Sequence, residues 1–254
     1  MIACAMLDLD ALFRQVLQHR RDDMPRIAYA NALGTDPRGE FIKVQIALAG
    51  GRERVGKQYY DSRRGRELLQ AHGAEWAAGV KPFVENYTFR RGFVERIVTS
   101  ARRFVDNAET LLKRAPLLDL VLRDSAKAAR ELFACPQLEG LRSLNLADST
   151  LGDEDAIRLA QSPYLSDLRW LNLSGNRIGR AGMEAIAASN RLPALKWIDL
   201  SYNAAPDPTP QPAEEYGMVH GEQITDFGKE LRRRFPDLEW LKGPGLVDPD
   251  YKMY

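Results

Sequence analysis

LRWLNLSGNRIGRAGMEAIAASNRLPA, residues 168–194, repeats the pattern of the residues on either side of it. LRSLNLADSTLGDEDAIRLAQSPYLSD precedes it at 141–167 and LKWIDLSYN follows it at 195–203, so the pattern returns every 27 residues. Leucine or isoleucine stands at positions 1, 4 and 6 of each copy. A fixed period of this length indicates a solenoid, in which stacked repeats bury one continuous core.

The phrase L-x-x-L-x-L-x-x-N, followed by I-G-x-x-G-x-x-A-I-A, resembles ribonuclease-inhibitor-like leucine-rich repeats over about residues 140–203. This resemblance implies a strand, a turn and a helix in each unit. A weaker copy, LLDLVL at 117–122, begins 24 residues before Leu141 and predicts an irregular first repeat. Residues 92–116 are expected to supply a strand and a helix that cap the array. The period fails after residue 203, and LEWL at 238–241 resumes the strand phrase.

Strand alternation determines which side chains of these repeats leave the core. If the leucines at positions 1, 4 and 6 point into the solenoid, positions 3 and 5 face the concave side of a parallel sheet. Position 3 holds Ser143, Trp170, Trp197 and Trp240, and position 5 holds Asn145, Asn172, Asp199 and Lys242. Since neighbouring strands lie about 4.8 Å apart, the tryptophans are expected to stack as an exposed aromatic ladder.

The aromatic ladder is expected to be a contact surface, because tryptophan and arginine dominate binding hot spots. The expected partner-binding residues are Trp170, Trp197, Trp240, Asn172, Asp199, Arg169, Lys196 and Tyr202. Two other interpretations stay open: the proline-rich insertion at 204–221 or the tail at 244–254 covers the ladder, or the ladder only strengthens the sheet. Asn176 and Asn203, at position 9, are expected to bond backbone groups of the turns.

The N-terminal part of the sequence predicts helices. Residues 7–34 contain two short amphipathic periods separated by HRRDDMP, with Asp22 or Asp23 as the N-cap candidate of the second. Gly34 is expected to end that helix. Two further helices are expected within 35–50 and 65–78.

Residues 22–48, DDMPRIAYANALGTDPRGEFIKVQIAL, resemble the repeat-companion domain found at the N-termini of many planctomycete and myxobacterial proteins. The residues that match its pattern are Pro25, Arg26, Tyr29, Ala30, Leu33, Asp36, Pro37, Arg38, Gly39, Glu40, Phe41, Ile42 and Gln45. The chain departs from the pattern at Asn31 and Ala32, where the family has Asp-Trp. The resemblance implies no known activity, but it implies that repeats follow in the same chain.

Composition narrows the class of protein. The 254 residues, 44% of them apolar, can bury a core, and 36 basic against 35 acidic residues give no overall attraction to nucleic acid or membrane surfaces. Cys4 and Cys135 do not suggest a disulfide framework or a metal site. The first residues do not read as a secretory signal, and no apolar run approaches the roughly 20 residues of a membrane span. A cytoplasmic protein is therefore expected.

The sequence does not carry the pattern of an active site. His19, His72 and His220 lie in unrelated segments, Gly-x-Ser-x-Gly is absent, and SGNRIG lacks the lysine of a phosphate loop. The acidic triplet at 153–155 is expected in the first turn of a helix, where carboxylates complement the helix dipole. We therefore expect no enzyme, no cofactor and no metal site.

Three features keep other interpretations open. The basic segment 52–66 interleaves tyrosines with arginines, as nucleic-acid sites do, although its acidic residues favour a solvated linker between helices. A cluster of Arg38, Glu40 and a histidine in one cleft would favour an accessory subunit or small hydrolase with a site in the N-terminal domain. The alternating prolines of DPTPQP, at 207–212, predict an extended polyproline-like loop.

The sequence thus predicts an α/β protein with an N-terminal helical domain at 1–85 and a leucine-rich-repeat domain at 86–254. The second domain is expected to be a short curved solenoid with a parallel sheet on its concave face and helices on its convex face. The expected function is non-catalytic recognition of a protein or peptide partner on the concave face. A monomer or weak homodimer is expected.

Overall fold

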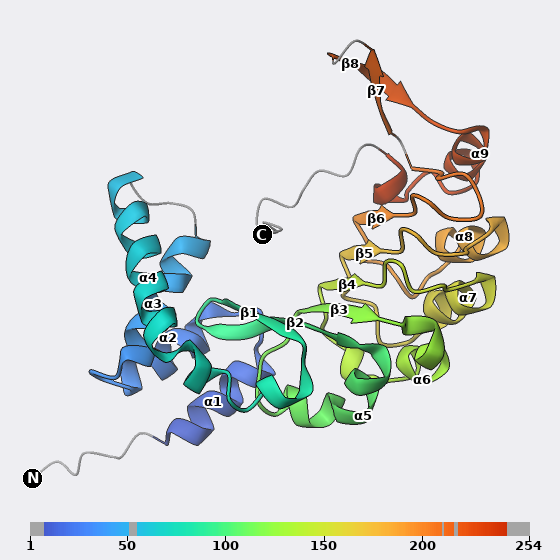
Figure 1. Ribbon diagram of the computed structural model, residues 1–254. Coiled ribbons are helices and arrows are strands. Elements are labelled where there is room, and N and C mark those ends of the chain that lie inside the picture. Colours follow the sequence, from blue (N-terminus) through green and yellow to red (C-terminus); the bar gives the residue numbers. More distant parts are fainter. Residues whose placement is uncertain (1–7, 51–54, 210, 216–217, 243–254) are drawn as a thin grey trace, which may run out of the picture. The chain divides into compact units, whose positions relative to one another are not determined.

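The computed structural model describes residues 8–50, 55–209, 211–215 and 218–242, with side chains described except at 55–61 and 211–223 (Figure 1). The chain divides into two compact units. The N-terminal unit consists of the described residues up to Ile97 together with Glu109–Leu118, and the repeat unit consists of Val98–Ala108 and the described residues from Asp119 on. The domain boundary expected after residue 85 stays a prediction, because packing alone does not show which part of the chain folds independently.

The N-terminal unit begins with helices and continues as a β-hairpin. The helices are α1 (Leu9–Gln18), α2 (Asp23–Ala32), α3 (Pro37–Ala49) and α4 (Val55–Trp76). After the short 3-10 helix η1 (Lys81–Phe83) come the hairpin strands β1 (Asn86–Arg90) and β2 (Phe93–Ser100). The end of β2 and the first part of the following helix α5 (Ala101–Leu112), up to Ala108, belong to the repeat unit. None of the helices in the described ranges is long and apolar enough to cross a membrane.

Aspartates start three of the helices. Asp8, Asp22 and Asp36 accept hydrogen bonds through their side chains from backbone N–H groups in the first turns of α1, α2 and α3. Gly34 follows α2 with a φ of 61°, the left-handed conformation that commonly ends a helix. The predicted N-cap at Asp22 and the predicted stop at Gly34 are confirmed. α4 begins earlier than predicted, at Val55.

A small apolar core packs the helices on the hairpin. Val16, Ala30, Ile42 and Phe93 form one cluster, and none of them is more than 3% exposed. The turn between β1 and β2 is Arg91–Gly92, whose φ angles of 47° and 84° are both positive, as a tight two-residue hairpin turn favours. A Cβ at Gly92 would lie 2.4 Å from Cγ1 of Ile42. Glycine is therefore required for α3 to approach the turn.

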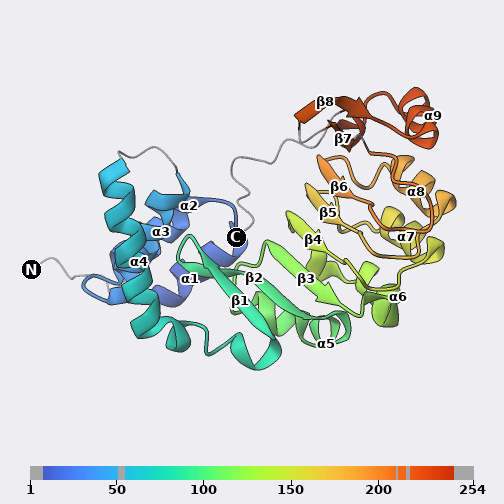
Figure 2. The same cartoon turned by 45° about the horizontal axis from the view of Figure 1, so that its top comes forward.

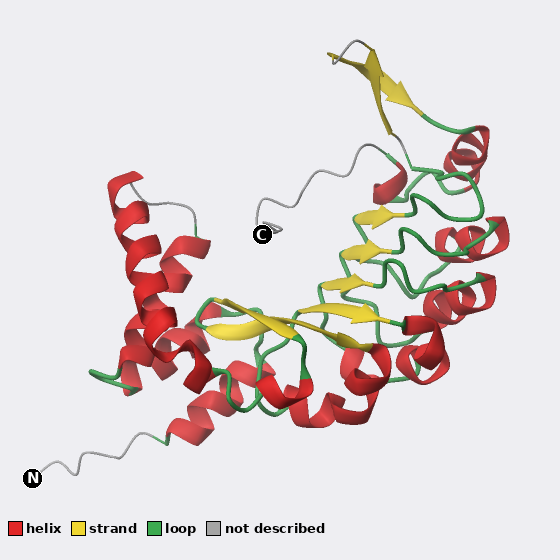
Figure 3. Ribbon diagram, in the orientation of Figure 1, coloured by secondary structure: helices red, strands yellow, loops and turns green. Residues whose placement is uncertain are grey.

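The repeat unit alternates strands with helices. β3 (Asp119–Arg123), β4 (Ser143–Asn145), β5 (Trp170–Asn172) and β6 (Trp197–Asp199) are parallel neighbours. They line one side of the unit, and α6 (Ala129–Phe133), α7 (Asp153–Gln161), α8 (Arg180–Ala187) and α9 (Asp226–Arg234) lie on the other (Figure 2, Figure 3). The 3-10 helices η2 (Ser125–Ala128) and η3 (Pro136–Leu138) belong to the irregular first repeat. The predicted α/β architecture is confirmed.

The strand register confirms the alignment of the repeats. Ser143 pairs with Trp170, and Trp170 pairs with Trp197, so the 27-residue period of the sequence is also the register of the sheet. Asp119 pairs with Ser143, which places the shorter copy at 117–122 where it was predicted. The position-4 residues Leu144, Leu171 and Ile198 are all less than 5% exposed and build the core.

Asn176 and Asn203 hold the turns that follow the strands. The buried amide of Asn176 bonds five backbone groups, those of Leu146, Ser149, Leu151, Leu173 and Ser174. It therefore connects its own turn to the turn of the preceding repeat. Asn203 does the same one repeat further on, donating to the carbonyl of Leu173 and accepting from the N–H of Ile178. The structural role predicted for both asparagines is confirmed.

The chain after Asn203 departs from two predictions. β7 (Gln211–Glu215) and β8 (Met218–Gln223) form an antiparallel hairpin with Pro212 opposite Glu222, so the expected polyproline-like loop is wrong for these residues. Proline fits here because each strand of a two-stranded ribbon has one edge on which an N–H needs no partner strand. LEWL forms the 3-10 helix η4 (Glu239–Leu241) in place of the expected strand. The tail at 244–254 lies outside the described residues.

Replacing Asn176 with alanine is expected to lower the free energy of unfolding by about 3 kcal/mol, because several buried backbone groups lose their partners. Chemical denaturation followed by circular dichroism measures this loss. Asn190→Ala, at an exposed position after α8, is the matched control and is expected to change stability by less than about 0.5 kcal/mol. Equal effects of the two substitutions would contradict the structural role of Asn176.

Candidate functional site

The position-3 residues form a column across the repeat unit. The register places Asp119, Ser143, Trp170 and Trp197 side by side on β3, β4, β5 and β6. The rings of Trp170 and Trp197 lie 5.4 Å apart between centroids and are tilted by 39°, so the two tryptophans stack as expected. Their exposure differs, since Trp170 is 4% exposed and Trp197 is half-buried. The expectation of an exposed Trp170 is therefore wrong.

Trp240 does not continue the column on a strand. It lies in η4, where the N–H groups of Leu241 and Lys242 bond the carbonyls of Leu238 and Glu239, three residues back in each case. These local bonds replace the pairing of a strand with β6. Trp240 is 3% exposed, so the expected third exposed rung is also wrong. Whether the insertion or the tail covers the tryptophans is not tested, because the side chains of 211–223 and all of 243–254 lie outside the described part of the chain.

The position-5 side chains have a role that the sequence analysis missed. Oδ1 of Asn145, Asn172 and Asp199 accepts a hydrogen bond from the backbone N–H two residues later, at distances of 2.9 to 3.0 Å. Asn172 and Asp199 also accept from the hydroxyl groups of Ser174 and Ser201. Asn-x-Ser and Asp-x-Ser are typical of such turns, so this signal was present in the sequence. One oxygen of each of these residues therefore shapes the strand-to-turn junction.

The position-2 residues lie at the entry of the strands. The carbonyl of Arg169 accepts hydrogen bonds from the N–H groups of Lys196 and Trp197, both at 3.0 Å. The backbone of Arg169 thus joins β5 to the entry of β6. The side chain of Arg169 is half-buried and that of Lys196 is exposed. Lys196 is therefore the more accessible of the two predicted cations.

Tyr202 is the predicted site residue with the most unusual geometry. Its side chain is 89% exposed, and its backbone is left-handed with a φ of 55°. The same turn position is left-handed in the preceding repeats, where it is occupied by Asp124, Asp148 and Gly175. Aspartate and glycine tolerate this conformation far better than a bulky aromatic residue does. An exposed aromatic ring on strained backbone is a common mark of a functional position.

The acidic triplet at 153–155 is used within the repeats. It forms the first turn of α7, as predicted. Oδ1 of Asp153 also accepts hydrogen bonds from the N–H groups of Gly179 and Gly182, so it caps the start of α8 in the next repeat. Within the described residues, no group of histidine, cysteine and acidic side chains is placed to hold a metal ion.

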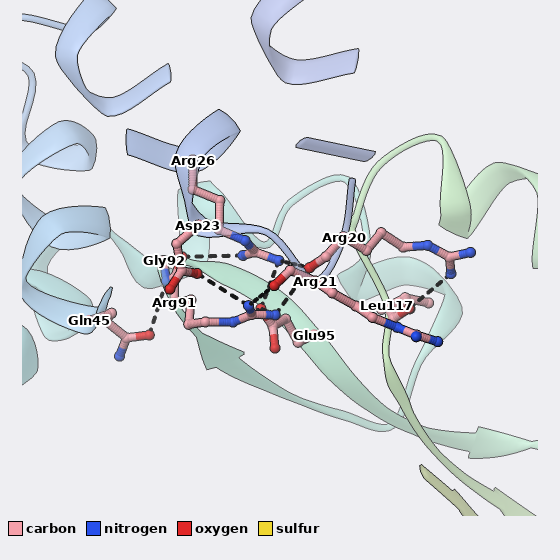
Figure 4. Close-up of polar contacts among 9 residues, drawn as sticks. All are labelled: Arg20, Arg21, Asp23, Arg26, Gln45, Arg91, Gly92, Glu95 and Leu117. Carbon is pink, nitrogen blue, oxygen red and sulfur yellow. Dashed lines mark hydrogen bonds and ion pairs between the residues drawn. The ribbon is translucent and has the colours of Figure 1, made fainter. Parts of the chain in front are cut away.

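A buried ion cluster joins the α1–α2 loop to the hairpin of the N-terminal unit (Figure 4). Arg26 is fully buried, and its Nη2 lies 2.8 Å from Oε1 of Glu95. Arg91 approaches the same oxygen at 2.9 Å and also pairs with Asp23 at 3.2 Å. Both arginines donate to the carbonyl of Arg20. Two guanidinium groups therefore surround one buried carboxylate.

Burial and charge act in opposite directions in this cluster. Burial lowers the pKa of Arg26 to about 10 and raises the pKa of Glu95, while their mutual attraction opposes both shifts. Because two guanidinium groups lie within 3.0 Å of Glu95, we treat its carboxylate as ionised at neutral pH. The pairing of its members thus keeps the groups of the cluster charged. Arg26 is accordingly a structural residue of the N-terminal unit.

An open cavity of about 460 Å³ lies within the N-terminal unit. Arg38 and His72 line it, together with the aromatic side chains Phe13, Tyr29, Trp76 and Phe93. Glu40 does not line it, and its carboxylate accepts two 2.7 Å hydrogen bonds from Arg64. The cluster of Arg38, Glu40 and a histidine that would favour an accessory subunit or hydrolase is therefore not assembled.

The basic segment 52–66 is described in part. From Val55 it belongs to α4, while residues 52–54 and the side chains of 55–61, including both tyrosines, lie outside the described residues. Further along the helix Arg63 pairs with Glu67, and Arg64 pairs with Glu40. Two arginines of the segment are therefore engaged with carboxylates. Nucleic-acid binding by this segment stays an untested prediction.

Comparison with known proteins identifies the repeats. Residues 141–160 and 164–187 match a family model described as a leucine-rich repeat, and the segment 141–187 therefore consists of leucine-rich repeats. Proteins with such repeats are generally protein-interaction scaffolds and typically non-catalytic. The search among curated proteins finds no match to this chain. The resemblance of residues 22–48 to the repeat-companion domain stays a prediction.

The left-handed backbone at Tyr202 leads to a prediction about stability. Tyr202→Gly is expected to be more stable than Tyr202→Ala by about 1 kcal/mol, because glycine adopts a positive φ without strain and alanine does not. Both substitutions remove the same exposed ring, so denaturant unfolding of the two variants isolates the backbone term. An alanine variant as stable as the glycine variant would show that the turn relaxes in solution.

The ion cluster leads to a second prediction. Glu95→Gln is expected to lower the free energy of unfolding by about 3 kcal/mol, because it leaves buried guanidinium groups without their carboxylate. The matched control is Glu67→Gln, which removes an exposed carboxylate paired with Arg63 and should cost less than about 1 kcal/mol. Urea titration of both variants measures the difference. Similar costs at the two sites would mean that the cluster does not stabilise the unit.

Proposed function

We propose that this protein is a non-catalytic recognition module that binds a protein or peptide partner on the concave face of its leucine-rich repeats. The observation that carries the proposal is Tyr202, a tyrosine that is 89% exposed and held on left-handed backbone in the turn after β6. Strain of this kind is not needed for the turn, since glycine stands at the same position one repeat earlier. A binding role would explain why an aromatic ring stands there.

The tryptophans support the same proposal, but with Trp197 as the contact residue and Trp170 as its support. Trp197 is half-buried, and its ring stacks on the buried ring of Trp170. Trp170 therefore acts as a support that fixes the position of Trp197. A side chain already held in place loses little conformational entropy when a partner docks, so its contact area contributes more fully to affinity. Trp197 and Tyr202 are accordingly the proposed anchors.

The remaining site residues are proposed to orient the partner. Lys196 is exposed and directly precedes Trp197 in the chain. Arg169 lies at the corresponding position one repeat earlier. Cations at the rim of an interface mainly steer association and select against the wrong partners. Asn172 and Asp199 retain one polar atom beyond the turn contacts made by Oδ1. Trp240 is proposed to close the end of the apolar core rather than to contact the partner.

A test starts from peptides selected from a displayed random library against the immobilised full chain. Their affinities are then measured by fluorescence polarisation for the wild type, Trp197→Ala and Tyr202→Gly. Each substitution is expected to weaken binding by about tenfold or more, as the loss of an aromatic hot spot does. Tyr202→Gly is especially informative, because it removes the ring without straining the turn.

The matched control is Tyr164→Ala, which removes a half-buried tyrosine between α7 and β5. Its effect on affinity is expected to be less than about twofold. Peptides that bind Trp197→Ala and Tyr202→Gly as tightly as the wild type would refute recognition on the concave face. The same conclusion would follow if selection against the full chain yields no specific peptide.

A further inference from the structure

Two arginines of the N-terminal unit, the buried Arg26 and the partly buried Arg38, differ in their partners. Burial lowers the pKa of both Arg26 and Arg38 to about 10, so both remain cations at neutral pH. Arg26 lies 2.8 Å from the carboxylate of Glu95. Arg38 forms no ion pair within the described residues, and its buried Nη1 has no hydrogen-bond partner there. Asp36 attracts Arg38 through space, but in that part of the chain no carboxylate forms an ion pair with its partly buried guanidinium.

Aromatic rings hold the guanidinium of Arg38 in place. Its Cζ lies 4.7 Å from the ring centroid of Trp76, 5.1 Å from that of Phe93 and 5.4 Å from that of Phe89. The faces of these rings attract the cation, but they do not satisfy the N–H donors that lie in the guanidinium plane. The arrangement therefore fixes the group and leaves hydrogen-bonding capacity unused.

Arg38 lines the cavity of about 460 Å³, a size suited to a small ligand. The other acidic and basic side chains of the wall are Asp36, His72, Glu75 and Arg114. Asp36 caps α3 by accepting the N–H of Arg38, and Arg114 donates to the carbonyl of Gly79 at 2.7 Å. His72 lies 4.0 Å from Glu75 and stacks on Trp76. Arg114 is exposed, whereas Arg38 is partly buried and has a buried Nη1 left for a ligand.

We propose that this cavity binds a small organic carboxylate, with the carboxylate on the guanidinium of Arg38 and the apolar body against Trp76 and Phe93. A planar guanidinium matches a carboxylate in geometry, and desolvation strengthens the pair. A single unoccupied arginine among aromatic walls suits one negative charge on an apolar body better than a doubly charged phosphate. The site rests on the N-terminal unit alone and goes beyond the proposed recognition by the repeats.

The first experiment is calorimetric titration of the full chain with phenylacetate, phenylacetamide and phenyl phosphate. Phenylacetate is expected to bind at least about tenfold more tightly than either of the other two. The amide has nearly the same shape without the charge, so the difference measures the contribution of the carboxylate. Equal binding of acid and amide, tighter binding of phenyl phosphate, or no binding of phenylacetate at millimolar concentration would overturn the proposal.

The carboxylate could belong to a free acid or to the end of a peptide. An acetylated tripeptide ending in phenylalanine, with a free or an amidated carboxyl end, separates the two sources. A free-ended tripeptide that binds as tightly as phenylacetate identifies a peptide terminus as the ligand, and weaker binding identifies a free acid. Selective binding of the amidated form would contradict the site.

The second experiment uses Arg38→Met, which keeps the length of the side chain and removes its charge. Phenylacetate affinity is expected to fall at least about tenfold, while the unfolding temperature stays the same or rises because a partly buried charge without an ion-pair partner is gone. Arg63→Met, at an exposed arginine paired with Glu67, is the matched control and should change affinity less than about twofold. Unchanged binding by Arg38→Met would refute the site. If this variant does not fold, the comparison of acid with amide on the wild type decides.

Discussion

Backbone groups that are cut off from water need hydrogen-bond partners, and in this protein polar side chains are among those partners. In the repeat unit the amide of Asn176 ties together the turns of two successive repeats. In the N-terminal unit Arg26 and Arg91 donate to carbonyl groups of the α1–α2 loop, including that of Arg20. The stacking of the repeats and the packing of the first helices on their hairpin both depend on this constraint. A substitution at one of these few polar residues is therefore expected to disturb more than one turn or helix at once.

The residues that match the repeat-companion pattern acquire physical roles from these contacts. Arg26 pairs with Glu95, and Gln45 accepts the N–H of Gly92 in the hairpin turn. At Gly39 a Cβ would lie 2.7 Å from the carbonyl oxygen of Ala30, so glycine permits the close approach of α2 and α3. Several residues of the pattern thus dock helices on one another or on the hairpin. Arg38 differs from the others, because its contacts are with aromatic rings that line a cavity.

The repeats could be predicted in detail because their signal is local and periodic. Leucines at a fixed spacing determine the faces of each strand, and the register from Ser143 to Trp170 to Trp197 followed directly. The exposure of the tryptophans could not be predicted in this way, since it depends on what packs against each strand. Trp170 has a strand on both sides, and Trp240 lies in a 3-10 turn where the pattern LEWL had suggested a strand. A short apolar pattern at the end of a repeat array does not distinguish a strand from a 3-10 turn.

The sequence by itself was sufficient for the solenoid of leucine-rich repeats, the asparagines of its turns and the N-terminal helices, because each of these follows from residues close together in the chain. The ion cluster and the cavity required the tertiary structure. Arg26 of α2 pairs with Glu95 of β2, and Arg38 of α3 contacts the ring of Trp76 in α4. Charge compensation and cavity walls depend on which side chains meet in space. Contacts between residues that are distant in the sequence leave no periodic pattern from which they could be predicted.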